Sequence, residues 1–169
     1  AHAAAYMIAA LRLGWFKVHR PLEFYAAYFT VKQTGFDAEL MLDKERAQKA
    51  RVDYEALLNP TAKEEDTLTM LYLVLEMLCR GIEFLPVDVF KSATFAFVPE
   101  NGKIRLPLFS LNGLGETAAE NIYKAIHEEN ASTLEDLKNK AGLNKKVIEV
   151  LKKSGAVDNL AESDQLTLF

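Results

Sequence analysis

Two glycines, Gly113 and Gly115, stand one residue apart where the sequence SLNGLGETAAENI leads into a predicted helix. Glycine permits a tight turn, and the start of a helix presents free backbone N–H groups at the positive end of its dipole. Such a turn can hold one phosphate oxygen through backbone groups alone. Contacts of this kind recognise a nucleic-acid backbone and carry no base specificity. The candidate phosphate-binding residues are Gly113, Leu114, Gly115 and Thr117.

The segment AGLNKKVIEVLKKSG looks like a degenerate second copy of this turn, with one glycine, Gly142. From Lys138 to Lys153 the chain has six lysines and one acidic residue, a local charge of 6 − 1 = +5. Two such hairpins would grip both strands of a DNA duplex, and the lysines would add an attraction that salt weakens. The alternatives are an ordinary Gly-x-Gly turn and a solvated lysine face. The candidate DNA-binding residues of the second hairpin are Asn144, Lys145 and Lys146.

The last five residues, QLTLF, carry three large apolar side chains after a polar, acidic spacer. An extended peptide of this pattern can insert its apolar side chains into the groove of a partner protein while a polar side chain binds at the edge. The alternative is a tail that folds back onto the core of its own chain. The candidate partner-binding residues are Gln165, Leu166, Leu168 and Phe169.

The composition limits the class of protein. The chain has 169 residues, is half apolar, and carries 20 basic against 24 acidic residues, a net charge of 20 − 24 = −4. These values are typical of a globular chain with one core or two small domains, and they exclude a basic coat over the whole molecule. One cysteine excludes an internal disulfide, and three dispersed histidines lack metal-binding spacing. No segment can span a membrane, which predicts a cytoplasmic protein without membrane contacts.

Helices dominate the predicted structure, because apolar residues recur at three- and four-residue spacing. Caps and helix breakers predict four longer helices, of which the third runs from Asp37 to about Leu58. Asn101-Gly102 predicts the turn of a small β-hairpin. The signals that bound the other longer helices are Pro21, Pro60, the Thr61 and Glu64 capping box, and Gly81. Three short helices are expected over 116–130, 134–141 and 145–154.

The predicted fold is therefore mainly α-helical. It has a helical subdomain, a small β-hairpin, a compact tandem helix-hairpin-helix domain and an extended C-terminal tail. The first residue is not methionine, and we interpret the sequence as a fragment whose missing part lies upstream. The predicted boundaries are 1–92 for the helical subdomain, 93–110 for the β-hairpin, 111–160 for the tandem domain and 161–169 for the tail.

The opening HAAAYMIAALRLGWFKVHRPLEFYAAYFT resembles the fingers segment of the bacterial replicative DNA polymerase III alpha subunit. LEMLCRGIEFLPVDVFKSATFAFV, a tight hairpin and the step into Gly-Leu-Gly continue the resemblance, which covers essentially the whole chain. QLTLF is similar to the pentapeptide by which bacterial replication proteins bind the sliding clamp. Because the sequence stops soon after the paired hairpins, without a further OB-type domain, it resembles the PolC branch of the family rather than the DnaE branch.

The resemblance implies the C-terminal portion of a DNA-directed DNA polymerase, a nucleotidyltransferase, with the end of its fingers at residues 1–92. His2 and Tyr6 match the family motif and are the implied contacts near the incoming nucleotide. The chain offers no tight carboxylate pair for two Mg²⁺ ions, so the palm and its Mg²⁺ are expected upstream. This fragment is then expected to have no catalytic residue, no cofactor and no activity alone. The implied partners are double-stranded DNA, the sliding clamp and other replisome subunits.

Two other functions stay open at this stage. The first is a non-enzymatic adaptor that binds DNA and the clamp without belonging to a polymerase. The second is a helical protein-interaction module in which Gly-Leu-Gly is an ordinary turn. The second alternative predicts that the chain does not bind duplex DNA even at low salt.

Overall fold

Eight α-helices and three short strands make up residues 2–162, the part of the chain that the computed structural model describes. The helices are α1 (His2–His19), α2 (Pro21–Val31), α3 (Ala38–Met41), α4 (Lys44–Glu55), α5 (Ala62–Cys79), α6 (Glu116–His127), α7 (Leu134–Lys140) and α8 (Lys145–Lys153). The strands are β1 (Phe84–Leu85), β2 (Val98–Glu100) and β3 (Lys103–Arg105). Two 3-10 turns are η1 (Gln33–Gly35) and η2 (Leu108–Ser110). The predicted mainly α-helical fold with a small β-hairpin is confirmed.

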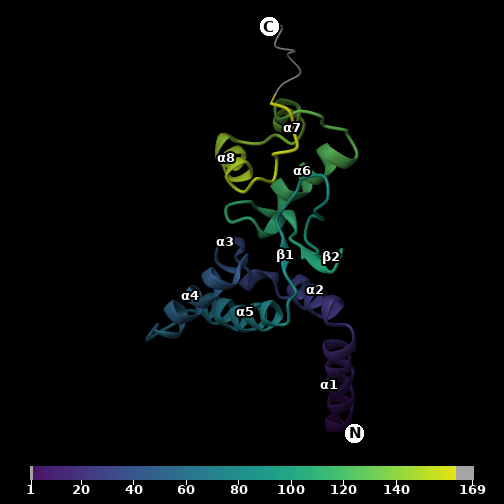
Figure 1. Cartoon of the computed structure of the whole chain (residues 1–169). Coiled ribbons are helices and arrows are strands. Elements are labelled where there is room, and N and C mark those ends of the chain that lie inside the picture. The colour runs from purple at the N-terminus through teal and green to yellow at the C-terminus, as the bar shows by residue number, and fades with distance from the viewer. Residues whose placement is uncertain (1, 163–169) are drawn as a thin grey trace.

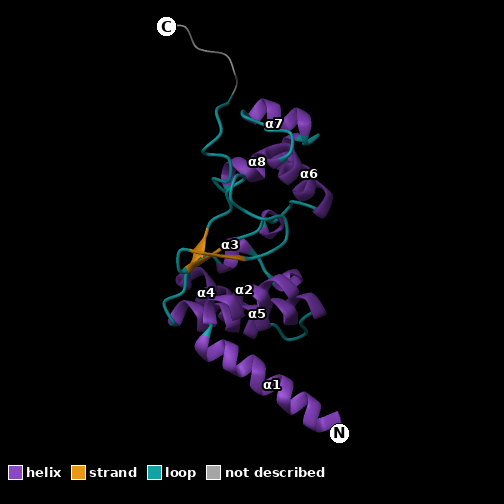
Figure 2. Ribbon diagram, turned by 90° about the vertical axis from the view of Figure 1, so that its right-hand side faces the viewer, coloured by secondary structure: helices purple, strands orange, loops and turns teal. Residues whose placement is uncertain are grey.

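The elements follow one another along an elongated molecule (Figure 1). α1 projects at the N-terminal end, and helices α2 to α5 form a helical body beside it. The sheet lies in the middle, and α6, α7 and α8 form a hairpin domain at the other end (Figure 2). α1 and the hairpin domain therefore lie at opposite ends of the molecule.

Side-chain caps set the helix boundaries of the helical body. The capping box at the start of α5 is confirmed, with the backbone N–H of Thr61 donating to Glu64 Oε2 at 2.6 Å. The predicted single helix over 37–58 is wrong, because Asp43 takes an extended conformation (φ −132°, ψ 165°). Its carboxylate accepts a hydrogen bond from the N–H of Arg46 and so begins a new helix. The chain therefore forms two helices there, α3 and α4.

An aromatic cluster fills the core between the helical body and the sheet. Tyr25 and Phe29 of α2 are fully buried, with ring centroids 6.0 Å apart. Phe36 packs edge-on against Phe97, with centroids 4.8 Å apart, and also against Phe84 of β1. Burial of each such ring stabilises the fold by about 1.5–3 kcal/mol. This cluster joins α2 to the sheet.

The three strands form one small sheet in the order β1-β3-β2. β2 and β3 are antiparallel, and the positive φ angles of Asn101 (51°) and Gly102 (79°) confirm the predicted hairpin turn. β1 pairs in parallel with β3, with Phe84 opposite Ile104. This strand was not predicted from the sequence, because two residues are too few to show an alternating pattern.

Polar contacts connect the sheet to the hairpin domain. The Arg105 guanidinium is buried and donates to both carboxylate oxygens of Glu100, at 2.8 and 2.7 Å. It also donates to the carbonyl of Pro86 at 2.8 Å. In the same loop after β1, the N–H of Val89 donates to the carbonyl of Ala156, just after α8, at 3.0 Å. This loop therefore ties the hairpin domain to the sheet, and the boundaries at 92, 110 and 160 stay a prediction.

Two predicted caps shape the hairpin domain. Thr133 Oγ1 accepts from the N–H of Asp136 at 3.1 Å and begins α7. Asn144 Oδ1 accepts from the N–H of Val147 at 2.9 Å and begins α8. The three helices pack around apolar side chains of the core, of which Ile122, Leu137 and Leu151 are the largest that are fully buried.

Candidate nucleic-acid interface

The first candidate turn connects η2 to α6. Gly113 has a φ of +90°, in the region that favours glycine, and the Leu114 side chain is buried. Gly115 is the N-cap of α6 and supplies no side-chain cap. The N–H groups of Glu116 and Thr117, on the exposed first turn of α6, find no acceptor within residues 2–162. These donors at the positive end of the helix suit an anion.

The second candidate turn connects α7 to α8 and has a similar backbone geometry. Gly142 has a φ of +61°, and Leu143 is buried as Leu114 is in the first turn. Asn144 has φ −79° and ψ 165°, against −77° and 163° at Gly115. The two helix starts differ in their side chains, because Asn144 Oδ1 accepts from a helix N–H where Gly115 has no side chain, and because α6 begins with Glu116 whereas α8 begins with Lys145. The second turn therefore offers fewer open donors than the first.

The two hairpins lie against each other. A Cβ built on Gly113 would be 3.6 Å from Val150 Cγ2 of α8, an ordinary contact distance. Asn121 Nδ2 of α6 donates to the carbonyl of Ala141, at the end of α7, at 3.4 Å. These contacts place both turns in one structural unit.

Nothing within residues 2–162 requires a glycine at position 115. Gly115 has a φ of −77°, which suits any residue. An added Cβ would have no atom within 4 Å, so packing does not explain the absence of a side chain. Glycine also occurs where a ligand must approach the backbone closely, because it has no side chain to obstruct the ligand. The first turn therefore offers an open approach to its N–H groups.

Acidic side chains neutralise half of the six lysines between 138 and 153. The exposed positive charge is smaller than the sequence count of +5 indicates. Hydrogen bonds from the lysines lower the pKa of Asp136 and Glu162, which keeps these carboxylates charged near neutral pH. The ion pairs are Lys140–Asp136 at 2.7 Å, Lys152–Glu162 at 2.9 Å and Lys153–Glu39 at 2.9 Å. The lysines without an acidic partner among the described residues are Lys138, Lys145 and Lys146.

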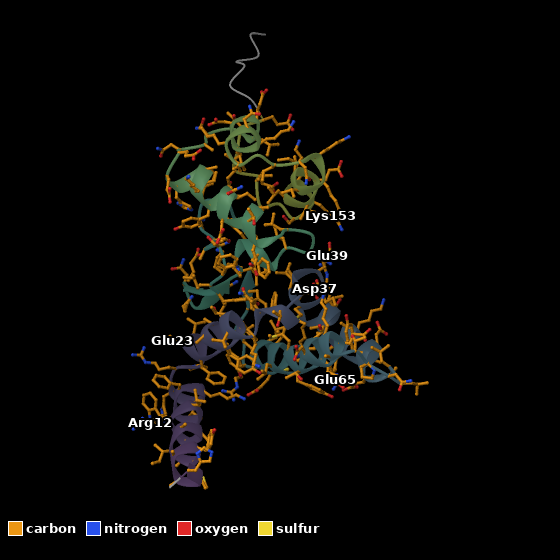
Figure 3. All side chains as sticks on the ribbon, turned by 180° about the vertical axis from the view of Figure 1, so that it is seen from behind. Arg12, Glu23, Asp37, Glu39, Glu65 and Lys153 are labelled. Carbon is orange, nitrogen blue, oxygen red and sulfur yellow. The ribbon has the colours of Figure 1, made fainter. Side chains whose placement is uncertain are left out.

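A hollow of about 690 Å³ lies between the hairpin domain and helices α3 and α4, with Arg46, Lys153 and Glu39 among its lining residues. Lys153 and Glu39 face each other there (Figure 3), although 114 residues separate them in the chain. A second hollow of about 550 Å³ is lined by Gly113 and by Lys63 of α5. Glu39, Arg46 and Lys63 were not predicted from the sequence, because no local pattern indicates a contact between distant elements.

The structure does not bring all the predicted site residues together. His2 and Tyr6 lie on α1, at the opposite end of the molecule from α6 to α8 (Figure 1). Their rings form an edge-on pair with centroids 4.6 Å apart. The predicted partner-binding residues of the tail lie outside the described residues; they are Gln165, Leu166, Leu168 and Phe169.

Two other kinds of feature, a metal site and a membrane-spanning helix, are absent from residues 2–162. Within residues 2–162, no three His, Cys, Asp or Glu side chains gather into a cluster that could hold a metal ion. No helix in the described part of the chain is both long enough and apolar enough to cross a membrane. The candidate interface consists of glycines, open backbone donors and lysines.

Comparison with known proteins matches residues 81–166 to the family described as "Helix-hairpin-helix motif". Over its whole length the chain is similar to proteins named "DNA polymerase III PolC-type". It is 42% identical over 170 residues to the one from Thermotoga maritima. The identity is 42% over 171 residues with Staphylococcus saprophyticus and 40% over 171 residues with Staphylococcus aureus. The chain is covered completely in these matches and spans 12% of the length of each relative.

Proposed function

Because the chain belongs to the helix-hairpin-helix family and is similar over its whole length to a segment of PolC-type DNA polymerases, we propose that it is the DNA-binding C-terminal portion of a replicative polymerase. It binds duplex DNA without base preference and so supports processive, template-directed synthesis by the parent enzyme. The observation that carries the proposal is the shared backbone geometry of the turns at Gly113–Gly115 and Gly142–Asn144.

Each hairpin holds the sugar-phosphate backbone through the start of a helix. The open N–H groups of α6 bind a phosphate oxygen, and Gly115 lets that oxygen approach the main chain. The second hairpin has fewer open N–H groups, and Lys145 and Lys146 on its first helical turn add charge attraction. Backbone recognition of this kind depends on duplex geometry and charge rather than on base sequence.

A duplex-binding titration tests this proposal. The 169-residue chain is titrated against labelled duplexes of unrelated sequence at low and at raised salt. We expect weak binding that is the same for each duplex sequence. The binding constant K falls steeply with salt: log K decreases by about 0.9 for each tenfold rise in salt concentration and for each phosphate contacted. Absence of binding at low salt contradicts the proposal and favours the protein-interaction alternative.

The C-terminal pentapeptide is the proposed clamp-binding element. The pattern of Gln165 with Leu166, Leu168 and Phe169 supports this assignment. Burial of the three apolar side chains stabilises a complex by roughly 5–8 kcal/mol before ordering costs, which leaves an affinity in the micromolar range. A clamp titration with the full chain and with a chain that ends at Asp164 tests it. Equal affinity of the two chains contradicts the assignment.

The chemistry of the parent polymerase is proposed to lie outside these 169 residues. Phosphoryl transfer with two Mg²⁺ ions needs clustered carboxylates, and residues 2–162 contain no cluster that fits such a site. No catalytic step is therefore assigned to them, and we expect no nucleotide incorporation by this chain alone. His2 and Tyr6 stay candidates for contacts near the nucleotide in the complete enzyme.

A further inference from the structure

Helix α1 exposes large apolar side chains to water, which is energetically unfavourable. None of its residues is buried, although apolar side chains lie on all sides of it. A helix that is apolar all round is typically buried within a larger protein or a membrane, and α1 is too short or too polar to cross a membrane. Its large apolar side chains, each between 49% and 68% exposed, are Tyr6, Met7, Ile8, Leu11, Leu13, Trp15, Phe16 and Val18.

Only the last turn of α1 is held by distant polar contacts. Lys17 Nζ lies 2.7 Å from Glu76 Oε2 of α5, and Arg80 Nη1 donates to the Lys17 carbonyl at 3.1 Å. The Lys17 ammonium also lies 5.7 Å from the centroid of the Phe24 ring. The preceding turns project from the helical body without burying a side chain (Figure 2).

Gly14 is the second unexplained feature of this helix. Glycine is among the least favourable residues in a helix interior, and no atom lies within 4 Å of a Cβ built at Gly14. Ala10 lies one turn earlier on the same face, with Met7 and Leu11 beside it. A small residue flanked by large apolar ones forms a notch, which lets a second helix approach the backbone of α1 closely.

We infer that α1 is a buried helix of the complete polymerase, where an apolar helix from the part of the polypeptide outside these 169 residues crosses it at Ala10 and Gly14. This inference rests on the proposed function. The chain spans 12% of its relatives' length, so most of a relative lies outside the matched segment and can supply that helix. α1 has no acidic residue, and because Lys17 is already paired with Glu76, Arg12 is the charge that it offers to a crossing helix, which is therefore neutral or acidic beside its apolar face.

Amide hydrogen–deuterium exchange tests the inference in two proteins, the 169-residue chain and the complete polymerase that contains it. We expect the α1 amides between Ala9 and Phe16 to exchange at least about tenfold more slowly in the complete polymerase. Equal exchange in the two proteins overturns the inference. Protection that appears in the 169-residue chain as its concentration rises also overturns it, because a second copy then covers the helix.

Substitution of Gly14 locates the crossing point. In the 169-residue chain, Gly14→Ala and Gly14→Leu both leave α1 exchange unchanged or slower, because both residues favour the helix and meet no neighbour. In the complete polymerase, Gly14→Ala keeps the protection and Gly14→Leu loses roughly a factor of ten of it, because the larger side chain separates the helices. Equal protection with alanine and leucine overturns the crossing point. Duplex affinity, measured on the same variants, depends on the hairpins and not on α1. It therefore distinguishes a failure of the proposed DNA-binding function from a failure of this inference.

Discussion

Gly115 is a position where a substitution is expected to affect DNA binding much more than it affects folding. Its φ of −77° suits any residue, and an added Cβ meets no atom within 4 Å. We predict that Gly115→Ala weakens duplex binding roughly tenfold, because the methyl group keeps a phosphate oxygen away from the helix N–H groups. The free energy of unfolding falls by only about 1 kcal/mol or less, since alanine is the poorer N-cap. Fluorescence anisotropy and thermal unfolding measure the two effects.

Gly14→Ala is the matched control for this substitution. Gly14 lies on α1, at the other end of the molecule, and also has open space around its Cβ position. Its replacement leaves DNA affinity unchanged. Gly113→Ala loses stability as well as affinity, because a φ of +90° is strained for alanine. DNA binding by Gly115→Ala at the affinity of the unaltered chain contradicts the proposed phosphate site.

The lysines of α8 divide into a pair without acidic partners and a pair that is neutralised. We predict that the double substitution Lys145→Gln with Lys146→Gln makes duplex binding less sensitive to salt. The slope of log K against the logarithm of the salt concentration becomes shallower by about 2. The control exchanges Lys152 and Lys153 for glutamine, and its effect is smaller because Glu162 and Glu39 already neutralise these lysines. Titrations at several salt concentrations provide both slopes. An equal loss of salt dependence in the two double variants contradicts this division of the lysines.

The residues of the candidate site were predictable where their signals are local. Gly113 precedes the start of α6, and Asn144 caps α8 as predicted, because turn and cap preferences act within a few residues. The charge available to a ligand was not predictable. Lys153 is neutralised by Glu39, which is 114 residues away in the chain, and only the tertiary structure brings the two together.

The anchor of α1 depends on the ionisation of Glu76. Glu76 accepts hydrogen bonds from Lys17 at 2.7 Å and from Arg80 at 2.8 Å. Burial opposes its ionisation, but the hydrogen bond and charge of Lys17, with Tyr25 and Arg80, hold its pKa below the usual 4.5. The charged form therefore stabilises the fold above pH 4.5. This stabilisation is lost as the pH falls through the lowered pKa of the folded state.

We predict that Glu76→Gln lowers the free energy of unfolding by about 1 kcal/mol or less at pH 7, because these ion pairs are about one-third exposed. The difference from the unaltered chain shrinks as the pH falls below 4.5, where Glu76 itself becomes protonated. Urea unfolding across this pH range, followed by the fluorescence of Trp15, measures the difference.

Glu23→Gln is the control for the α1 anchor. Glu23 pairs with Arg20 at 3.1 Å, on an exposed surface and only three residues away. Its replacement therefore changes the free energy of unfolding by no more than a few tenths of a kcal/mol at any pH tested. A Glu76→Gln variant that behaves like Glu23→Gln at pH 7 contradicts the anchoring role.

The elements themselves were predictable to different degrees. The capping box of α5 and the Asn101-Gly102 hairpin follow from short motifs with few alternatives. The break between α3 and α4 was missed, because Asp43 stands in a charged run that reads equally well as the surface of one helix. β1 was missed because its pairing with β3 comes from the tertiary structure rather than from its own sequence.

On the scale of the whole molecule, the hairpin domain and the helical body share one continuous apolar core, and they also line a hollow between them. The ion pair between Glu39 and Lys153 lies at this hollow, and the N–H of Val89, in the loop after β1, donates to the carbonyl of Ala156 and ties the hairpin domain to the sheet. Asn112, next to the first turn, and Lys153 of α8 both line the hollow, so a duplex held by the hairpins would adjoin this junction. The junction is therefore a place where the charge of the helical body can influence DNA binding.

The final prediction concerns this influence. The Lys153 and Glu39 side chains are 78% and 59% exposed, so their ion pair is worth less than about 1 kcal/mol and a phosphate can replace the carboxylate. We predict that Glu39→Gln strengthens duplex binding about two- to threefold at low salt and has no effect at high salt, because it frees Lys153 for a phosphate.

Glu65→Gln removes the same charge from α5, well away from Lys153 (Figure 3), and serves as the control for net charge. It changes duplex affinity less than Glu39→Gln does, because the field of an exposed charge is screened beyond about 10 Å at 0.1 M salt. Equal gains from the two substitutions would assign the effect to net charge alone. Weaker DNA binding by Glu39→Gln would show instead that the ion pair holds the hairpin domain in the orientation that DNA requires.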